Sequence, residues 1–135
     1  LYSIQVTRHS DDRILLVTAG DDGVLIFDWK KDIIDGLVEQ NNSNTIISPM
    51  ANFRPWPSAV EDRIEINDVQ LCGSHLFGAA GDAFGCYKWD LETQKLLTTY
   101  RLPGHGYMHS VEVVPNNSGG ASNLLLTGGE DGILG

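Results

Sequence analysis

The feature that most constrains this chain is a pattern that recurs three times: an apolar run, a turn rich in Gly and Asp, and a second apolar run. The copies lie near residues 14–29, 76–90 and 111–135. In the first copy, Asp22 and Gly23 separate the two runs, and glycine tolerates the positive φ that a tight turn requires. Each copy therefore predicts a β-hairpin, and the third stops just after its turn, so we expect its outgoing strand to be missing.

Hairpins that repeat at a period of tens of residues favour a β-propeller over a sandwich or a barrel. From Asp22 to Asp131 the mean period is about 54 residues, longer than the roughly 40–45 residues of an ordinary propeller blade. Two insertions account for the excess: residues 38–62, rich in Asn, Ser and Pro, and residues 116–123, with the composition of a flexible loop. Apolar residues at helical spacing after Trp29 predict a short helix.

Composition and charge exclude several classes of function. The chain has 135 residues, of which 41% are hydrophobic and 20% charged, as expected for one folded domain. Nine basic residues stand against eighteen acidic ones, for a net charge of -9, so this segment is not expected to bind nucleic acid directly. No apolar stretch reaches the ~20 residues of a membrane span. We therefore expect no membrane association. We also expect no small-molecule substrate, because the sequence shows no catalytic constellation.

The two cysteines, Cys72 and Cys86, stand in apolar strand-like segments without a CxxC pair or a histidine at metal-ligand spacing. We interpret them as buried thiols of a reducing compartment and expect neither a metal site nor a cofactor. The first residues, from Leu1 onward, contain no initiator methionine and no signal peptide. This start indicates a chain that begins partway through a longer protein.

Residues 102–105, the strand-like run 111–115 and the turn at 128–132 together resemble a WD repeat, and Trp89-Asp90 matches the dipeptide that names this family. The resemblance implies an all-β fold in which residues 1–135 form a partial WD-repeat β-propeller. It would comprise about two and a half blades of a seven-bladed ring. Trp29 and Trp89 are expected in the blade cores.

The WD-repeat family also implies a buried hydrogen-bonded set of four side chains. Its members here are His105, Thr127 and Asp131, with the fourth expected about six residues beyond Asp131. An imidazole and a carboxylate are tolerated in a core only when they are paired, so we expect the set to be structural. No nucleophile or metal ligand accompanies it, and we expect no catalytic residue in the chain.

The run from residue 80 to residue 93, the segment 104–111 and the Gly-Gly-Glu-Asp-Gly turn at 128–132 are similar to the THO complex subunit 6 family. The chain departs from that family at Asp28-Trp29, where Trp-Asp is usual, after His105, and in both insertions. The resemblance implies a non-catalytic scaffold in the nucleus that supports mRNA processing and export. Its partners would be other subunits of the THO and export complex, with RNA contacted mainly through them.

Two alternatives remain open. A WD-repeat substrate receptor of a cullin-type ubiquitin ligase would share every fold signal and differ only in the face that binds. An enzymatic propeller, such as a hydrolase, would need a convergent catalytic constellation that the sequence does not show. Trp56, between two prolines, would either contact a partner or pin the first insertion onto a blade edge, and we favour the second role.

Overall fold

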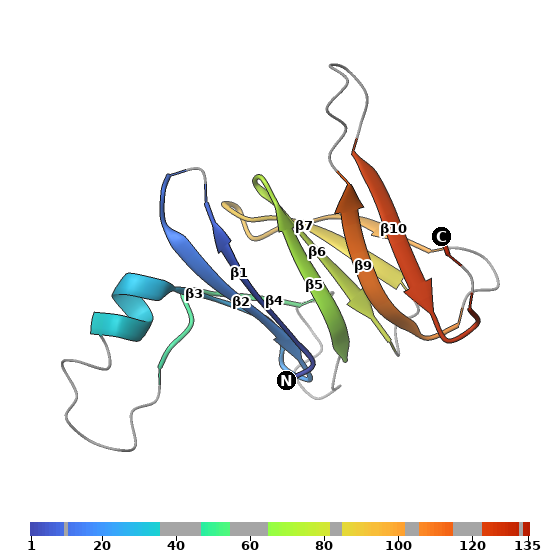
Figure 1. Ribbon diagram of the computed structural model, residues 1–135, viewed down its shortest axis with the longest axis horizontal. Helices are drawn as coiled ribbons and strands as arrows, with labels where there is room; N and C mark the ends of the chain where they lie inside the picture. The colour runs from blue at the N-terminus through green and yellow to red at the C-terminus, as the bar shows by residue number, and fades with distance from the viewer. Residues whose placement is uncertain are drawn as a thin grey trace.

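The computed structural model describes residues 1–9, 11–35, 47–54, 65–81, 85–101, 106–114, 123–132 and 134–135. Within them the chain is built almost entirely of antiparallel strands, as expected for an all-β fold (Figure 1). Sheet 1 contains β1 (Ser3–Arg8), β2 (Ile14–Gly20), β3 (Gly23–Asp28) and β4 (Ala51–Phe53). Sheet 2 contains β5 (Ile66–Cys72), β6 (His75–Ala80), β7 (Gly85–Asp90) and β8 (Leu96–Tyr100). Sheet 3 pairs β9 (Met108–Val114) with β10 (Leu124–Gly129).

Every strand of sheets 1 and 2 pairs with the strand next to it in the sequence, so each sheet is a simple antiparallel meander. The turn from β2 to β3 lies where the sequence predicts the first hairpin, and Gly20 pairs with Gly23 across it. Gly23 has a φ of 93°, and a Cβ at this position would meet the Phe53 carbonyl oxygen at 2.5 Å. Glycine is therefore required here both by the backbone conformation and by the close approach of β4.

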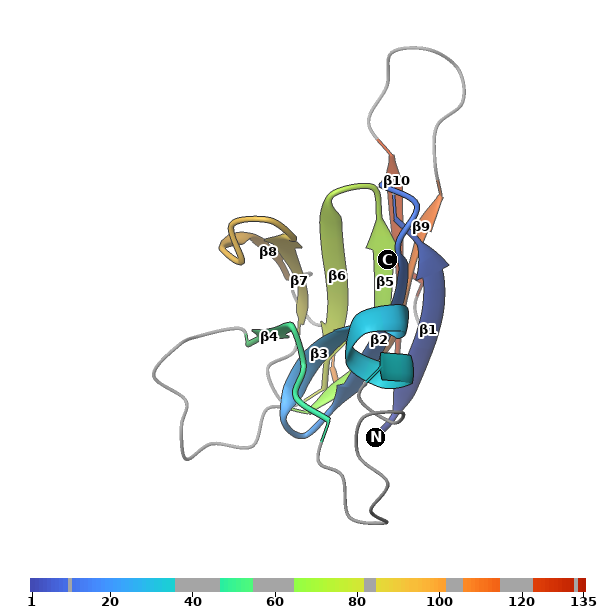
Figure 2. The same ribbon diagram turned by 90° about the vertical axis from the view of Figure 1, so that its left-hand side faces the viewer.

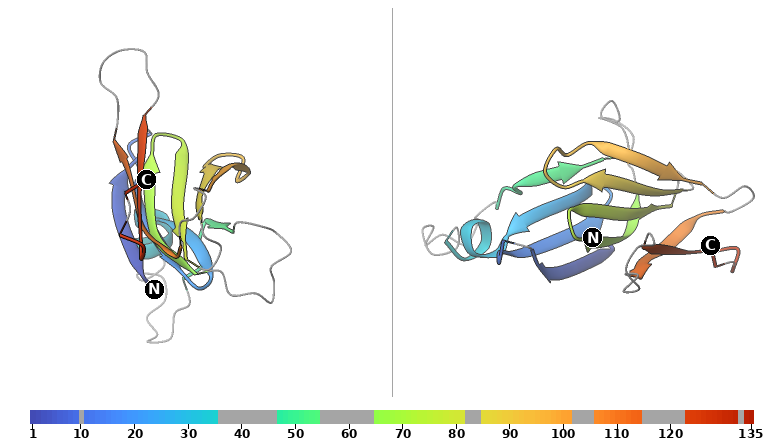
Figure 3. Two further views of the ribbon diagram at one scale, coloured as in Figure 1. Left: turned by 90° about the vertical axis from the view of Figure 1, so that its right-hand side faces the viewer. Right: turned by 90° about the horizontal axis from the view of Figure 1, so that it is seen from above.

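The three sheets stand in a row in the order in which the chain forms them (Figures 1 and 3). β5 contacts β1 and β2 on one side and β9 on the other. The first strands of the three sheets, β1, β5 and β9, thus lie next to one another. The later strands of each sheet lie farther from these three strands. The described residues form three sheets and no closed ring.

The sheets also repeat one another in detail. In sheet 2 the pairing shifts register after Ile66, and in sheet 3 it shifts at the corresponding point beside Met108. This shared β-bulge makes residues 66–71 of β5 equivalent to residues 108–113 of β9. In sheet 1, the pairing of β1 with β2 puts residues 1–6 at the positions that residues 66–71 occupy in sheet 2.

Each sheet has a forward face, turned toward the sheet that follows it, and a rear face, turned toward the sheet before it. The core between sheets 1 and 2 joins the forward face of sheet 1 (Leu15, Val17, Ala19, Val24, Ile26, Ala51 and Phe53) to the rear face of sheet 2 (Ile66, Val69, Leu71, Leu76, Ala80, Tyr87, Trp89 and Leu91). The core between sheets 2 and 3 joins Cys72, Phe77, Ala79 and Cys86 to Met108, Val111, Val113 and Leu125. Burial of these faces against each other is the main force that holds the row together.

The third hairpin extends slightly farther than the sequence indicates. Leu134 forms a bridge to Gly128, and Gly135 exchanges two backbone hydrogen bonds with Thr127, of 2.9 and 3.1 Å. The expectation that the outgoing strand is missing is therefore corrected, because its first residues already pair with β10.

A short π-helix, η1 (Trp29–Asp35), follows β3 where the sequence predicts a helix. Figure 2 shows η1 beside the end of β3, on the side of sheet 1 away from sheet 2. Its first turn is held by Asp28, whose carboxylate oxygen Oδ1 accepts the backbone N–H groups of Lys30 and Lys31 at 3.0 Å each. No helix among the described residues has the length and apolar character that crossing a membrane requires.

Candidate docking site

Trp89 is the central side chain of the contact between sheets 1 and 2. It is 1% exposed, and its indole Nε1–H donates a hydrogen bond of 3.2 Å to the Arg54 carbonyl oxygen. Its ring stacks on Tyr87 with centroids 5.8 Å apart and meets Phe53 edge-on at 6.2 Å. The indole N–H is satisfied by the residue that follows β4, while the ring is buried between the two sheets.

Trp29 was predicted from the sequence to lie in a blade core, but it lies outside the core. The side chain is 39% exposed, and it begins η1 instead of standing inside β3. The pairing explains the difference, because Phe27 lies opposite Leu16 as Trp89 lies opposite Leu76. Phe27 therefore occupies in sheet 1 the position that Trp89 occupies in sheet 2. Because the order here is Asp28-Trp29, the tryptophan lies two residues beyond that position.

The expected hydrogen-bonded set is described only in part. Thr127 is 6% exposed in β10, and Asp131 lies in the turn that follows. Asp131 Oδ2 accepts the backbone N–H of Gly106 at 3.3 Å, which ties this turn to the segment leading into β9. His105 and Trp56 lie outside the described residues. The proposed set of His105, Thr127 and Asp131 therefore stays a prediction.

Polar side chains connect the first strands of neighbouring sheets, although those strands belong to different sheets. Ser3 Oγ of β1 donates to Asp68 Oδ1 of β5 at 2.8 Å, and the other carboxylate oxygen of Asp68 accepts the Val111 backbone N–H of β9 at 3.1 Å. One aspartate in the middle strand thus joins all three sheets.

A second connection occurs twice at equivalent positions. Gln5 Oε1 of β1 accepts the Leu71 backbone N–H of β5 at 2.9 Å, and Gln70 Oε1 of β5 accepts the Val113 backbone N–H of β9. Gln70 also donates through Nε2 to Glu112 Oε1 at 3.1 Å. Because equivalent residues make equivalent bonds, each sheet is placed against the next in the same way.

These connecting residues were not among the candidates identified from the sequence. Their signal is the alternation of polar and apolar residues in three segments, Ser-Ile-Gln-Val from Ser3, Asp-Val-Gln-Leu from Asp68 and Ser-Val-Glu-Val from Ser110. Such alternation predicts a strand with two different faces. It does not show that the polar face meets another sheet instead of water.

A surface groove of about 400 Å³ lies where the loop from β1 to β2 meets the start of η1. In this groove the half-exposed Trp29 and Ile14 lie among charged side chains: Asp11, Asp12, Arg13, Asp28, Lys30, Lys31 and Asp35. The mixture of apolar and charged groups of both signs suits contact with another protein. It is less suited to a nucleic-acid backbone, which requires a continuous positive surface.

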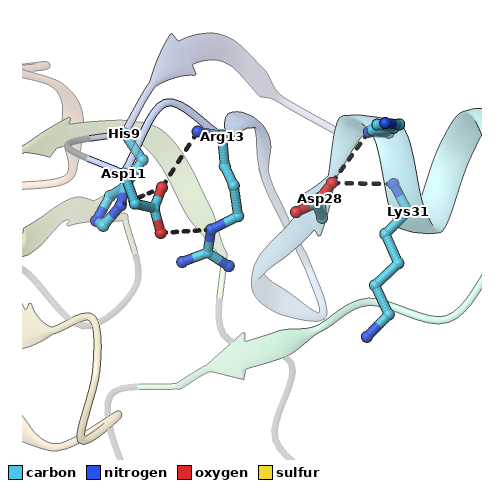
Figure 4. A network of polar contacts seen from close by, with 6 residues as sticks. His9, Asp11, Arg13, Asp28 and Lys31 are labelled. Atoms are coloured by element: carbon cyan, nitrogen blue, oxygen red, sulfur yellow. Dashed lines mark hydrogen bonds and ion pairs between the residues drawn. The ribbon is translucent and has the colours of Figure 1, made fainter.

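Asp11 organises the loop side of this groove (Figure 4). One of its oxygens lies 3.0 Å from His9 Nδ1, and the other accepts from Arg13 Nε at 2.6 Å. Burial raises the pKa of Asp11, but the hydrogen bonds from His9 and Arg13 outweigh that effect and lower it to about 2. Asp11 is therefore ionised throughout the physiological range, and the loop is fixed by a charged cluster.

No group of side chains that could hold a metal ion occurs among the described residues. Cys86 is buried, and burial raises the pKa of its thiol to about 12, so it stays protonated and unreactive. Cys72 is half-buried, and Asn123 Nδ2 lies 3.5 Å from its sulfur. The expected burial therefore holds for Cys86 and only partly for Cys72.

Comparison with known proteins gives one informative relative. The chain is 27% identical to the pre-rRNA-processing protein crb3/ipi3 of Schizosaccharomyces pombe, over 97% of this chain and 27% of that protein. The chain thus spans about a quarter of the length of the relative it matches. No protein-family model matches the sequence.

Proposed function

We propose that this chain is part of a WD-repeat β-propeller that serves as a non-catalytic docking scaffold in RNA processing. The observation that carries the propeller proposal is the repeated connection between sheets, in which Gln5 and Gln70 make the same bond to the following sheet. A meander that meets its neighbour through one repeated geometry generates a regular array of blades. Such an array is rigid and presents its turns and loops to partners.

The role in RNA processing is supported by the relative, whose name assigns it to pre-rRNA processing. The motifs around Trp89-Asp90 and Gly128–Gly132 support a finer assignment, to a subunit of the nuclear THO and export machinery that acts on mRNA. Under either assignment we propose that the protein acts in the nucleus and binds other proteins. We propose the THO assignment as the specific form and a pre-rRNA-processing assembly as the competing one.

Docking to a protein partner is supported by the kind of surface that the described residues present. The described groove beside Trp29 combines apolar area with charges of both signs, which suits a protein partner. The chain as a whole has a net charge of -9, which disfavours direct RNA binding. RNA would then be reached through partner subunits.

The proposal is tested by purifying the full-length protein with its partners from nuclear extract, with and without nuclease. We expect THO subunits to be recovered in both samples, since protein surfaces and not RNA would hold the assembly together. Recovery of pre-ribosomal factors would replace the THO assignment while keeping the role in RNA processing. Recovery of cullin adaptors would overturn that role, and loss of all partners after nuclease treatment would overturn docking through protein surfaces.

A further inference from the structure

The outer edge of sheet 2, formed by β8, stays open however many sheets the array contains. The sheets meet one another through their faces, while β8 is the last strand of sheet 2 and pairs only with β7 among the described strands. Figure 2 shows β8 on the side of the molecule opposite β1. Sheets added before or after the row would cover faces and leave this edge as it is. The outward N–H and C=O groups of β8 are therefore available to another strand.

The corresponding edge of sheet 1 is less suited to strand addition. β4 has three residues, and Ala51 and Phe53 are 6% and 1% exposed. β8 has five residues without proline or glycine, and Leu96 and Leu97 are 41% and 49% exposed. Leu96 lies opposite Trp89 on the rear face, which sheet 1 already covers, so a missing sheet does not account for its exposure. A longer edge strand with exposed apolar side chains favours pairing with another chain, whereas a short edge resists it.

The charges at the two ends of β8 restrict what can pair with it. Lys95 precedes the strand and Arg101 follows it, and both are exposed. Neither forms an ion pair within the part of the chain that the structure describes. If β8 paired in register with the same strand of a second copy, each cation would lie opposite another cation in either strand direction. Like charges in opposite positions destabilise a strand pair, so the edge disfavours a second copy and favours a segment with acidic ends.

We propose that the edge of β8 binds an extended segment of a partner protein by strand addition. The segment carries two acidic side chains six positions apart, as Lys95 and Arg101 are. Its main chain hydrogen-bonds to β8, which supplies the affinity, and its carboxylates pair with the two cations, which selects the partner. Apolar or β-branched side chains between the two acids extend the apolar surface of Leu96 and Leu97. Strand addition requires only the edge of sheet 2, so it does not depend on the role in RNA processing.

The test measures the binding of two fluorescently labelled peptides to the full-length protein by fluorescence anisotropy. The acidic peptide is Glu-Val-Thr-Val-Thr-Val-Glu, and the basic peptide has lysine in place of both glutamates. The charge-reversal variant carries Lys95→Glu and Arg101→Glu. The matched control carries Lys30→Glu and Lys31→Glu on η1, with the same change in net charge. All four side chains are exposed, and circular dichroism checks that both variants are folded.

We expect the wild type and the matched control to bind the acidic peptide about tenfold more tightly than the basic one, with a dissociation constant below about 1 mM. The charge-reversal variant should prefer the basic peptide. Absence of binding, equal binding of the two peptides, or an unchanged preference in the charge-reversal variant would overturn the proposal. A wild type that dimerises and thereby excludes the acidic peptide would show that a second copy occupies the edge, which would also overturn it.

Main-chain pairing is tested separately with two N-methylated forms of the acidic peptide. One form is methylated on the backbone nitrogens of the first, third and subsequent alternate residues, and the other form on the remaining set. Only alternate N–H groups of a strand face its partner, so one form should lose binding while the other retains it. Equal binding by the two forms would show that side chains alone hold the peptide, which contradicts strand addition.

Discussion

Asp68 and Gln70 show how a few polar side chains can position whole sheets. Each satisfies a backbone N–H group of β9, although β5 and β9 are not paired in any sheet. A buried N–H group that loses its acceptor has a large desolvation cost, so these side chains select one placement of the neighbouring sheet. The apolar contacts around them stabilise packing in general but are less selective.

Replacing Gln70 with Ala should lower the free energy of unfolding by about 1–2 kcal/mol, because the Val113 N–H group loses its acceptor. The measurement is chemical denaturation followed by tryptophan fluorescence. Glu92→Ala, at an exposed turn residue, is the matched control and should change stability by less than about 0.5 kcal/mol. Equal effects of the two substitutions would contradict a connecting role for Gln70.

The charged cluster around Asp11 predicts a specific pH dependence. The folded-state pKa of Asp11 is lowered to about 2 from its ordinary value of 3.8, so the folded state favours the ionised form. Its contribution to stability is therefore fully present above about pH 4 and is lost as the pH falls toward 2. The difference in melting temperature between the wild type and Asp11→Asn should be constant from pH 7 to pH 5 and shrink below pH 4. A difference that does not depend on pH would contradict the ion pair.

At the scale of secondary-structure elements, the position of a residue relative to its strand matters more than its type. Trp89 lies within β7, where alternation turns its ring toward sheet 1, and it is buried there. Trp29 lies one residue past the end of β3, where alternation no longer places it in a core. Two tryptophans in similar local sequences therefore have different environments.

This difference predicts unequal effects of truncation. Trp89→Ala should destabilise the protein by about 3–5 kcal/mol, because it leaves a large cavity between sheets 1 and 2. Trp29→Ala should cost less than about 1 kcal/mol, because the side chain is already half-exposed. Thermal melting of the two variants provides the comparison. Similar losses would show that Trp29 belongs to a core after all.

At the scale of the whole molecule, charge governs the expected contact with RNA. Nine basic residues stand against eighteen acidic ones, so few phosphate charges could be neutralised. We expect the purified chain to bind single-stranded RNA weakly, with a dissociation constant in the range of about 10⁻⁴ M or above at physiological salt. Fluorescence anisotropy with a labelled oligonucleotide measures it. Submicromolar binding would require a concentrated basic surface and would contradict RNA contact through partners.

Much of the fold could be predicted from the sequence. Short-range chemistry determined the all-β class, the three hairpins and the helix after Trp29, because alternation and turn residues act over a few positions. The repeat also indicated that the hairpins belong to a propeller-like array. Candidate residues chosen for their type alone were less well placed, as Trp29 shows.

Only the tertiary structure decided which neighbour each face meets. The alternating residues of β1 and β9 have similar patterns, yet Ile4 is open while Val111 is buried. Likewise, the sequence allows Gln70 to face water. The bulge and the pairing register of β5 instead place its side chain where it accepts the Val113 N–H group of sheet 3. Local sequence determines that a strand has two sides. Long-range packing assigns a partner to each side, because it depends on residues far away in the chain.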